Sequence, residues 1–138
     1  MAHEFKWVLR VPFADTDMAG IVHFANFFRY MEAAETDFLH ALGMSVSWAA
    51  GGQRYGFPRV SVACDFKRPV RFEDVLEIAV TVEEVGRKSV RYRFDFARGG
   101  QEVAVGRITA VYCRHAPDRG MESLEIPAEL RAKLTGNS

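Results

Sequence analysis

The sequence predicts an α+β fold in which a five-stranded antiparallel sheet wraps around one long central helix. Residues 24–42 carry apolar side chains at helical spacing over a long continuous stretch. One segment before this helix and four after it alternate apolar and polar side chains, which is typical of half-buried strands. The turns between the later strands are short, and short turns join antiparallel neighbours. A helix this apolar needs a cover, which the sheet supplies.

Size and charge indicate an ordinary globular protein. The chain has 138 residues, of which 49% are hydrophobic and 26% charged, and we expect a single domain over residues 1–138. Lys and Arg together number 18, as do Asp and Glu, so the formal net charge is zero. This balance gives no support for a nucleic-acid partner. It permits self-association, because little charge repulsion opposes it.

The cysteines and the N-terminus predict a cytoplasmic protein. Cys64 and Cys113 lie far apart in apolar, strand-like runs and lack the spacing of a metal site, so we expect reduced core residues. Residues 1–10 lack the apolar region of a signal peptide. No apolar run approaches the roughly 18 residues of a membrane-spanning helix, so no membrane span is expected.

An alternating strand and an acidic loop precede the helix. Residues 5–11 alternate with a period of two, and Pro12 ends this strand because it cannot continue the ladder. The loop then carries Asp15, Asp17 and Gly20 close to a helix N-terminus. Such an end has unpaired N–H groups and about half a positive charge, so it can hold an oxygen that gains negative charge. A nearby carboxylate can act as base or nucleophile.

The long helix is expected from Phe24 to Leu42, with Gly43 as a left-handed cap. At 1.5 Å per residue it forms a rod of roughly 28 Å. Its polar side carries charged and hydroxyl groups such as Arg29 and Thr36. Its apolar stripe recurs every three or four residues and consists of Phe27, Met31, Ala34, Phe38 and Leu42.

The second half of the chain is expected to be mostly strands. Residues 44–56 predict a loop with a short helical turn at Ser47–Ala50. Gly99-Gly100 indicates a tight hairpin, and Pro127 opens a short helix in the tail. The last strand-like run is apolar on both sides, which predicts burial of both faces. The four runs cover residues 60–66, 76–82, 90–96 and 103–113.

Three segments of the chain carry a resemblance to a known family. The segment FADTDMAGIVHFANF at residues 13–27 resembles the active-site segment of the hotdog-fold acyl-CoA thioesterases. The most similar branch is the 4-hydroxybenzoyl-CoA thioesterase group, with the Tol–Pal-associated short-chain acyl-CoA thioesterases. DFKRPVRFEDVL at residues 65–76 resembles that family's second motif, and GRKS at residues 86–89 is similar to a turn that meets coenzyme A phosphates. The likeness runs from about residue 5 to residue 114.

This resemblance implies a hotdog fold and the hydrolysis of acyl-CoA thioesters to a free carboxylic acid and CoA. It implies that no metal or cofactor is needed, coenzyme A being part of the substrate. It also implies a homodimer whose sheets join edge to edge, with active sites at the interface. Such dimers often pair again, so a homotetramer is expected, while the sequence leaves the choice between dimer and tetramer open.

Four residues of the first motif carry the catalytic roles that the resemblance implies. Asp17 matches the catalytic carboxylate, as nucleophile or as general base, and the sequence leaves both routes open. Phe24 aligns with the residue whose backbone N–H polarises the thioester carbonyl, and Gly20 lets the loop turn sharply. His23 departs from the family, because Tol–Pal relatives place a histidine one position later and hydroxybenzoyl relatives have an aromatic residue here. It is a candidate for orienting substrate or assisting proton transfer.

Substrate-binding candidates lie in two places. Arg87, Lys88 and Ser89 fit coenzyme A phosphates, Arg by paired hydrogen bonds and Lys as a point charge. Asn26 is expected to cap the helix or to bond Asp17. Asp15 is interpreted as a turn residue that bonds its own backbone.

Further alternatives stay open at this stage. Glu32 and Glu35 are weaker rivals to Asp17, because another hotdog branch uses a carboxylate on this helix. A dehydratase or hydratase acting on acyl thioesters, and a non-catalytic acyl-CoA-binding protein, are the alternative functions. The acyl group is undetermined, since the apolar candidates for lining its pocket suit an aromatic or an aliphatic chain. These candidates are Phe24, Phe27, Phe28 and Trp48.

Overall fold

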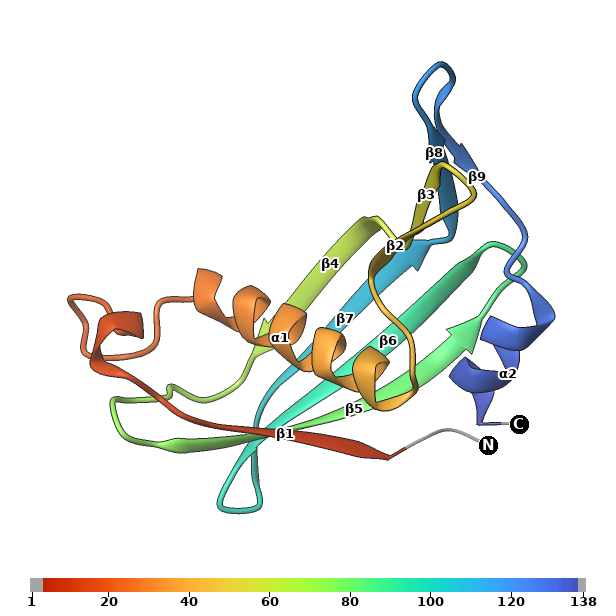
Figure 1. The fold of residues 1–138 in the computed structure, drawn as a ribbon. Coiled ribbons are helices and arrows are strands. Elements are labelled where there is room, and N and C mark those ends of the chain that lie inside the picture. The colour runs from red at the N-terminus through yellow and green to blue at the C-terminus, as the bar shows by residue number, and fades with distance from the viewer. Residues whose placement is uncertain (1–3, 137–138) are drawn as a thin grey trace.

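A five-stranded antiparallel sheet wraps one face of a 17-residue helix, α1 (Ala25–Ala41), as the computed structural model of residues 4–136 shows (Figure 1). The strand order is β1-β5-β6-β7-β4, and every neighbouring pair is antiparallel. The predicted fold class is therefore confirmed. The strands are β1 (Phe5–Arg10), β4 (Arg59–Phe66), β5 (Val75–Val85), β6 (Ser89–Arg98) and β7 (Gln101–Val111).

Helix α1 lies where the apolar stripe places it, one residue shorter at each end than predicted. Gly43 follows with φ +73°, which confirms the left-handed cap. Gly106 on β7 lets the helix approach closely, because a Cβ there would lie 2.6 Å from the Met31 Cε atom. Four stripe residues are almost wholly buried; these are Phe27, Met31, Ala34 and Phe38.

The central strands bury the side chains that alternation assigned to the core. Tyr92, Phe94 and Phe96 point inward from β6 and are at most 1% exposed. The β6–β7 hairpin turns at Gly99 and Gly100, whose φ values of +56° and +80° suit a tight two-residue turn. The predicted hairpin is therefore confirmed.

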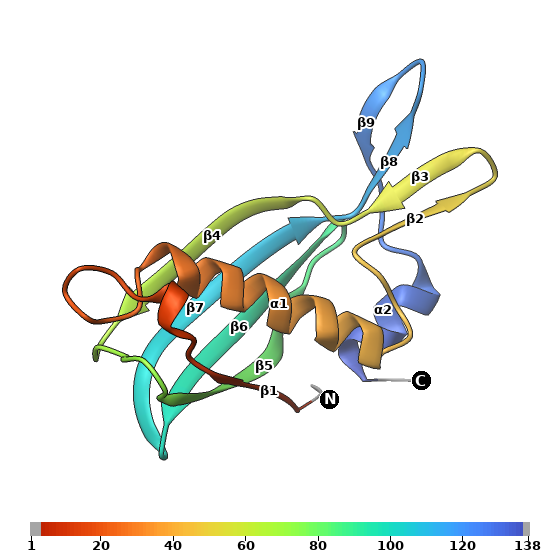
Figure 2. The ribbon, with the colours of Figure 1, turned by 60° about the vertical axis from the view of Figure 1, so that its left-hand side comes forward.

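A second, four-stranded sheet extends from one end of the first, with the order β2-β3-β8-β9 (Figure 2). The predicted helical turn at Ser47–Ala50 is wrong, since these residues form strand β2. Gly51 and Gly52, both at positive φ, close a hairpin in which Trp48 stacks on Tyr55. The predicted strand 103–113 is split between β7 and β8. The strands of this sheet are β2 (Ser47–Ala50), β3 (Gln53–Gly56), β8 (Cys113–Ala116) and β9 (Gly120–Ser123).

Two short helical elements complete the fold. A 3-10 turn, η1 (Phe13–Asp15), follows β1, and helix α2 (Ala128–Thr135) begins after Pro127 as expected. Arg131 on α2 donates to the backbone oxygen of Gly86 at 2.9 Å, which ties α2 to the β5–β6 turn. Cys64 and Cys113 are free thiols. In the described residues, no helix has the length and apolarity needed to cross a membrane.

Strand β4 lies at an edge of the main sheet and, among residues 4–136, pairs only with β7. Its apolar face points toward α1, because the Phe66 ring packs edge-on against Phe27 with centroids 4.9 Å apart. Val62, opposite Ile108, lies on the same face yet is 43% exposed, and Val60, at a register irregularity between Arg59 and Ser61, is 63% exposed. The alternation predicted this strand correctly, but its edge position leaves part of its apolar face uncovered.

An ion pair buried beneath this edge joins β4 to α1. The Glu35 side chain is fully buried, and the Arg59 guanidinium donates to Glu35 Oε1 from Nη2 at 2.6 Å and from Nε at 2.8 Å. Arg59 also lies 3.6 Å from Glu32. Glu35 Oε2 has no hydrogen-bond partner among the described residues. Burial raises the pKa of the Glu35 carboxyl, and the charge and hydrogen bonds of Arg59 oppose that rise.

Replacing Arg59 with leucine should lower the free energy of unfolding by about 3–5 kcal/mol at neutral pH, because it leaves a buried carboxylate without its cation. The folded-state pKa of Glu35 is raised, so the folded protein holds more protons than the unfolded chain, and stability falls as pH rises above the ordinary carboxyl pKa. Removing Arg59 removes the charge and hydrogen bonds that oppose the rise, so the pKa of Glu35 in the folded variant is higher still. The loss of stability in Arg59→Leu should therefore be smaller at about pH 5, where the buried carboxyl is more readily protonated, than at about pH 8.

Urea denaturation at both pH values measures this difference. Arg91→Leu is the control, because Arg91 forms an exposed pair with Glu84 at 3.2 Å, which is expected to contribute at most about 1 kcal/mol. Equal deficits in the two variants would contradict a buried, uncompensated carboxylate.

Candidate active site

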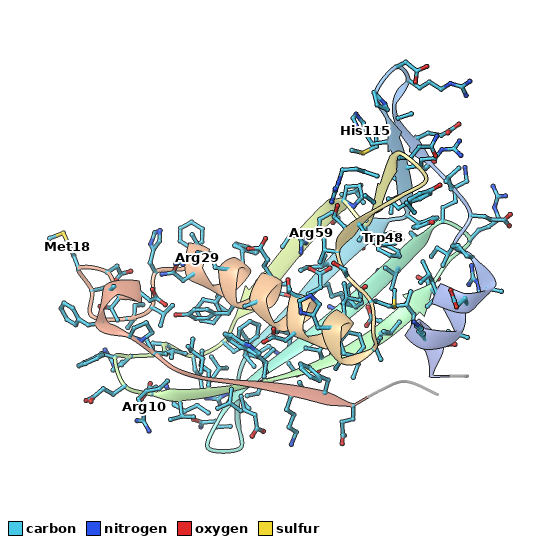
Figure 3. All side chains as sticks on the ribbon, in the orientation of Figure 1. Arg10, Met18, Arg29, Trp48, Arg59 and His115 are labelled. Atoms are coloured by element: carbon cyan, nitrogen blue, oxygen red, sulfur yellow. The ribbon has the colours of Figure 1, made fainter. Side chains whose placement is uncertain are left out.

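The acidic loop lies at the N-terminal end of α1, and the second sheet lies at the opposite end of the molecule (Figure 1). An isolated antiparallel bridge between Thr16 and Val22 closes the loop. Met18 is fully exposed at its tip, where Figure 3 shows it projecting away from the core. The loop is therefore a small hairpin that leads directly into α1.

Asp17 occupies this exposed tip. Its Oδ1 atom accepts a hydrogen bond from the Ala19 amide at 2.8 Å, and its own amide donates to the Ile21 oxygen at 2.8 Å. The backbone N–H of Gly20, at φ +80°, donates to the backbone oxygen of Asp17 at 2.9 Å. Within residues 4–136, the second carboxylate oxygen of Asp17 accepts no hydrogen bond, so it is available to a ligand.

The N-terminus of α1 is open. Phe24 occupies the N-cap position, and no side chain caps the helix. The Phe24 amide makes no hydrogen bond within the described chain. Its aromatic ring is 59% exposed and lies next to the exposed His23 ring, with centroids 5.0 Å apart. A free amide at the positive end of a helix can hold a negatively charged oxygen.

The other polar residues of the motif bond the loop itself. Asn26 is 8% exposed. Its side-chain amide donates to the backbone oxygen of Asp15 at 2.9 Å, and its Oδ1 accepts from Arg29 at 2.8 Å. The His23 backbone N–H donates to the same Asp15 oxygen at 2.9 Å. Asp15 does not bond its own backbone as predicted, because its carboxylate accepts the Tyr30 hydroxyl instead. Asn26 neither caps the helix nor bonds Asp17 as predicted, because its side chain bonds Asp15 and Arg29; it supports the loop, and a role in binding substrate stays a prediction.

A groove of about 320 Å³ runs from the helix N-terminus to the end of β4. Its walls are mostly apolar, with Lys67 and Arg68 as the cationic residues. Both cations are tied to Glu102, Lys67 at 3.1 Å through the carboxylate and Arg68 through the backbone oxygen. The other residues that line the groove are Ile21, Val22, Phe24, Phe27, Phe66, Pro69 and Val70.

The predicted phosphate-binding residues lie far from this loop in the same chain. Arg87 and Lys88 occupy the β5–β6 turn, beside α2 (Figure 1), and Ser89 begins β6. Arg87 lies 3.8 Å from Glu125, and the Lys88 ammonium is 3.4 Å from the Ser123 hydroxyl. One protomer therefore does not bring these residues together with Asp17.

A second groove, of about 390 Å³, lies between the second sheet and the start of β4. Its basic residues are Arg54, Arg59 and His115, and Figure 3 shows Arg59 between β4 and α1. The sequence did not predict this groove, because it depends on strands β2 and β8, which were not expected. Residues 4–136 contain no cluster of three or more His, Cys, Asp or Glu side chains suited to a metal ion.

Comparison with known proteins identifies the family of this fold and loop. Residues 11–134 match the family model of the thioesterase-like superfamily. The chain belongs to this superfamily, and it is an enzyme of the thioesterase class. The family resemblance predicted from the sequence is therefore confirmed.

Three relatives illustrate the match. The chain is 30% identical to 4-hydroxybenzoyl-CoA thioesterase of Pseudomonas sp. strain CBS-3, over 94% of this chain and 96% of that protein. It is 29% identical to 1,4-dihydroxy-2-naphthoyl-CoA hydrolase of Thermosynechococcus vestitus, over 90% of this chain and 84% of the relative. A shorter match, 31% identical over 56% of this chain and 58% of the relative, is to acyl-CoA thioester hydrolase YbgC of Escherichia coli.

Solved structures share the whole fold. Gentisyl-coenzyme A thioesterase BH1999 superposes with a TM-score of 0.80 at 29% identity, covering 94% of this chain and 99% of that one. An aspartate-to-asparagine mutant of 4-hydroxybenzoyl-CoA thioesterase, complexed with 4-hydroxybenzoyl-CoA, superposes at 0.79 with 25% identity, covering 95% and 98%. The predicted hotdog fold is confirmed.

Gly20→Ala should reduce thioesterase turnover, because alanine disfavours the left-handed backbone that lets this amide bond Asp17. Gly100→Ala is a matched control, since Gly20 and Gly100 share φ +80° and neither has an atom within 4 Å of an added Cβ. Each variant should lose about 1–2 kcal/mol of stability in thermal denaturation. Turnover that falls equally in both would argue against a special role of the loop.

Proposed function

We propose that the protein hydrolyses acyl-CoA thioesters, releasing a free carboxylic acid and CoA. The observation that carries this proposal is the open amide of Phe24, at the helix end reached directly from the loop that presents Asp17. Relatives named as thioesterases of hydroxybenzoyl-CoA and dihydroxynaphthoyl-CoA support the substrate class. The acyl groups in those names are aromatic, while YbgC is named only for acyl-CoA.

In the proposed mechanism, Asp17 either attacks the thioester carbonyl carbon or activates a water that does so, and the Phe24 amide stabilises the oxyanion. As general base, Asp17 takes a proton from water while the water oxygen attacks the carbonyl carbon; the C–S bond then breaks and the CoA thiolate takes up a proton. As nucleophile, the carboxylate attacks the carbonyl carbon, the C–S bond breaks and CoA leaves as a thiolate that takes up a proton; water then hydrolyses the resulting mixed anhydride to the free acid and restores the Asp17 carboxylate. The uncommitted oxygen of Asp17 serves either route.

The positive end of α1 favours the transition state in both routes. Negative charge develops on the carbonyl oxygen when the carbon becomes tetrahedral, and a fixed amide at a helix N-terminus stabilises that charge without reorganising. The donor is a backbone group, so the phenylalanine side chain does not impair it. We propose that His23 orients substrate or assists proton transfer, and its exposed position next to the Phe24 ring supports this role. The mechanism uses these protein groups without a metal or cofactor.

We further propose that two chains join through β4 to form a homodimer, and that two dimers form a homotetramer. Val60 and Val62 are apolar residues of this edge strand that remain exposed, so a second chain would cover them. Strand β4 runs from the second-sheet end to the loop end, so antiparallel pairing with its copy sets opposite ends side by side. Each active site would then lie at the interface.

This arrangement supports the assignment of the β5–β6 turn to coenzyme A. Arg87, Lys88 and Ser89 lie at the end of the molecule that a partner would bring to the Asp17 loop (Figure 1). The ligand would then contact Asp17 of one chain and the cations of the other.

We also propose a cytoplasmic location. The free thiols of Cys64 and Cys113 suit the cytoplasm, where thiols stay reduced.

Asp17→Asn should fold and assemble normally but lose turnover by about a hundred- to ten-thousandfold, because the amide can neither take a proton nor attack. The measurement is release of free thiol from a panel of short, medium, long and aromatic acyl-CoAs. Asp118→Asn, in the exposed β8–β9 turn, is the control and should keep full turnover. Full activity of Asp17→Asn would rule out the proposed role.

The same panel tests the alternatives for the function. Water addition to an enoyl thioester without thiol release would identify a hydratase. Measurable binding of acyl-CoA without any turnover would identify a binding protein. Either outcome would overturn the proposed hydrolysis.

Val62→Lys should convert the dimer to monomers, because a lysine on an edge strand opposes pairing with a second strand. Size-exclusion chromatography with light scattering measures the mass. Val8→Lys is the control, since Val8 is 58% exposed on β1, the opposite edge of the sheet, and should leave the dimer intact. A dimer that persists in Val62→Lys would place the interface elsewhere.

A further inference from the structure

We infer that Asp15, held by the Tyr30 hydroxyl, is a positioning residue that fixes the Asp17 loop to helix α1; this inference rests on the proposed function. The Tyr30 hydroxyl donates to Asp15 Oδ2 at 2.6 Å. Tyr30 is 5% exposed, and the Asp15 side chain is 16% exposed. A short hydrogen bond to a carboxylate in a partly buried place is among the stronger ones.

Asp15 joins the two sides of the loop and the helix at one point. Its backbone oxygen accepts from the His23 amide and from the Asn26 side chain, both at 2.9 Å. Its carboxylate accepts from Tyr30, while Arg29 lies 3.8 Å from the other carboxylate oxygen. Asp15 therefore connects the start of the loop, the end of the loop and the first turns of α1.

The Tyr30 hydroxyl is itself rigidly placed. Its ring packs against Trp7 and Phe27, with centroids 6.3 and 6.2 Å apart. Burial raises the pKa of the Tyr30 hydroxyl, and the Asp15 carboxylate raises it further. The hydroxyl thus remains a donor throughout the physiological pH range. A fixed donor in the core defines where Asp15 lies, and Asp17 follows two residues later.

Loss of this bond should displace Asp17 more than it disturbs the fold. Tyr30 is 5% exposed, and Tyr30 and Asp15 line a cavity beside Trp7 and not the groove at the helix N-terminus, so we assign them no contact with substrate. A misplaced reacting group lowers the rate of chemistry, and a shift of about 1 Å can cost a hundredfold. Binding that uses the distant cations would change little.

Tyr30→Phe should lower kcat about 10- to 100-fold and change KM by less than about twofold. Tyr92→Phe is a matched control, because it removes the same atom from a fully buried tyrosine whose hydroxyl has no partner among the described residues. It should keep wild-type kcat. Equal kcat in the two variants would overturn the inference.

Asp15 variants separate positioning from simple loss of stability. Asp15→Ala should match Tyr30→Phe in kcat, while Asp15→Asn, which keeps an acceptor oxygen, should recover part of it. The double variant Tyr30→Phe/Asp15→Ala should lose no more than either single variant, because both remove one bond. Additive losses would show that the two residues act independently, which contradicts the inference.

Hydrogen exchange provides a readout that does not depend on turnover. The amides of Asp17, Gly20 and His23 bond within the loop, so they should exchange faster in Tyr30→Phe than in Tyr92→Phe. If the wild-type protein released no thiol from any acyl-CoA, the proposed function would fail while this measurement still tested the positioning. Unchanged exchange at all three amides would refute it.

Discussion

Burial of one face of α1 against the sheet is the constraint on which the rest of the structure depends. Most of the stability of a helix in a protein comes from the packing of its apolar face, and each large apolar side chain that α1 buries contributes about 1.5–3 kcal/mol. Met31 and Phe38 are at most 1% exposed, and Gly106 provides the space that Met31 fills. This packing fixes the position and direction of the helix, so its N-terminus is presented at one end of the sheet.

The candidate site uses that end in two ways. The open Phe24 amide supplies a donor that no substitution other than proline removes, and the loop hairpin supplies the carboxylate of Asp17. The two acidic residues of the motif have different environments, because the 3-10 turn ends at Asp15 and the closing bridge begins at Thr16. One carboxylate is held against the helix by Tyr30, and the other remains exposed at the tip.

Much of this architecture could be predicted from the sequence. Helix α1, strand β1, the central strands and the Gly99-Gly100 hairpin follow from local spacing and from residues that permit only certain backbone angles. The motif around Asp17 indicates the family through its residue types and their order alone, and the family model confirms it. The strand β2 was missed because Ser47–Ala50 is short and rich in alanine, and its pairing with β3 decides its conformation.

The sequence by itself determined the periodicity of each element and the residue types near the helix N-terminus, because these depend on neighbours within a few positions. Only the tertiary structure decided which distant groups meet. Glu35 pairs with Arg59, and Asp15 pairs with Tyr30. The β5–β6 turn that carries Arg87 lies at the opposite end of the same chain from the loop that carries Asp17 (Figure 1). Such pairings depend on how the helix crosses the sheet, and no local pattern of residues specifies that crossing.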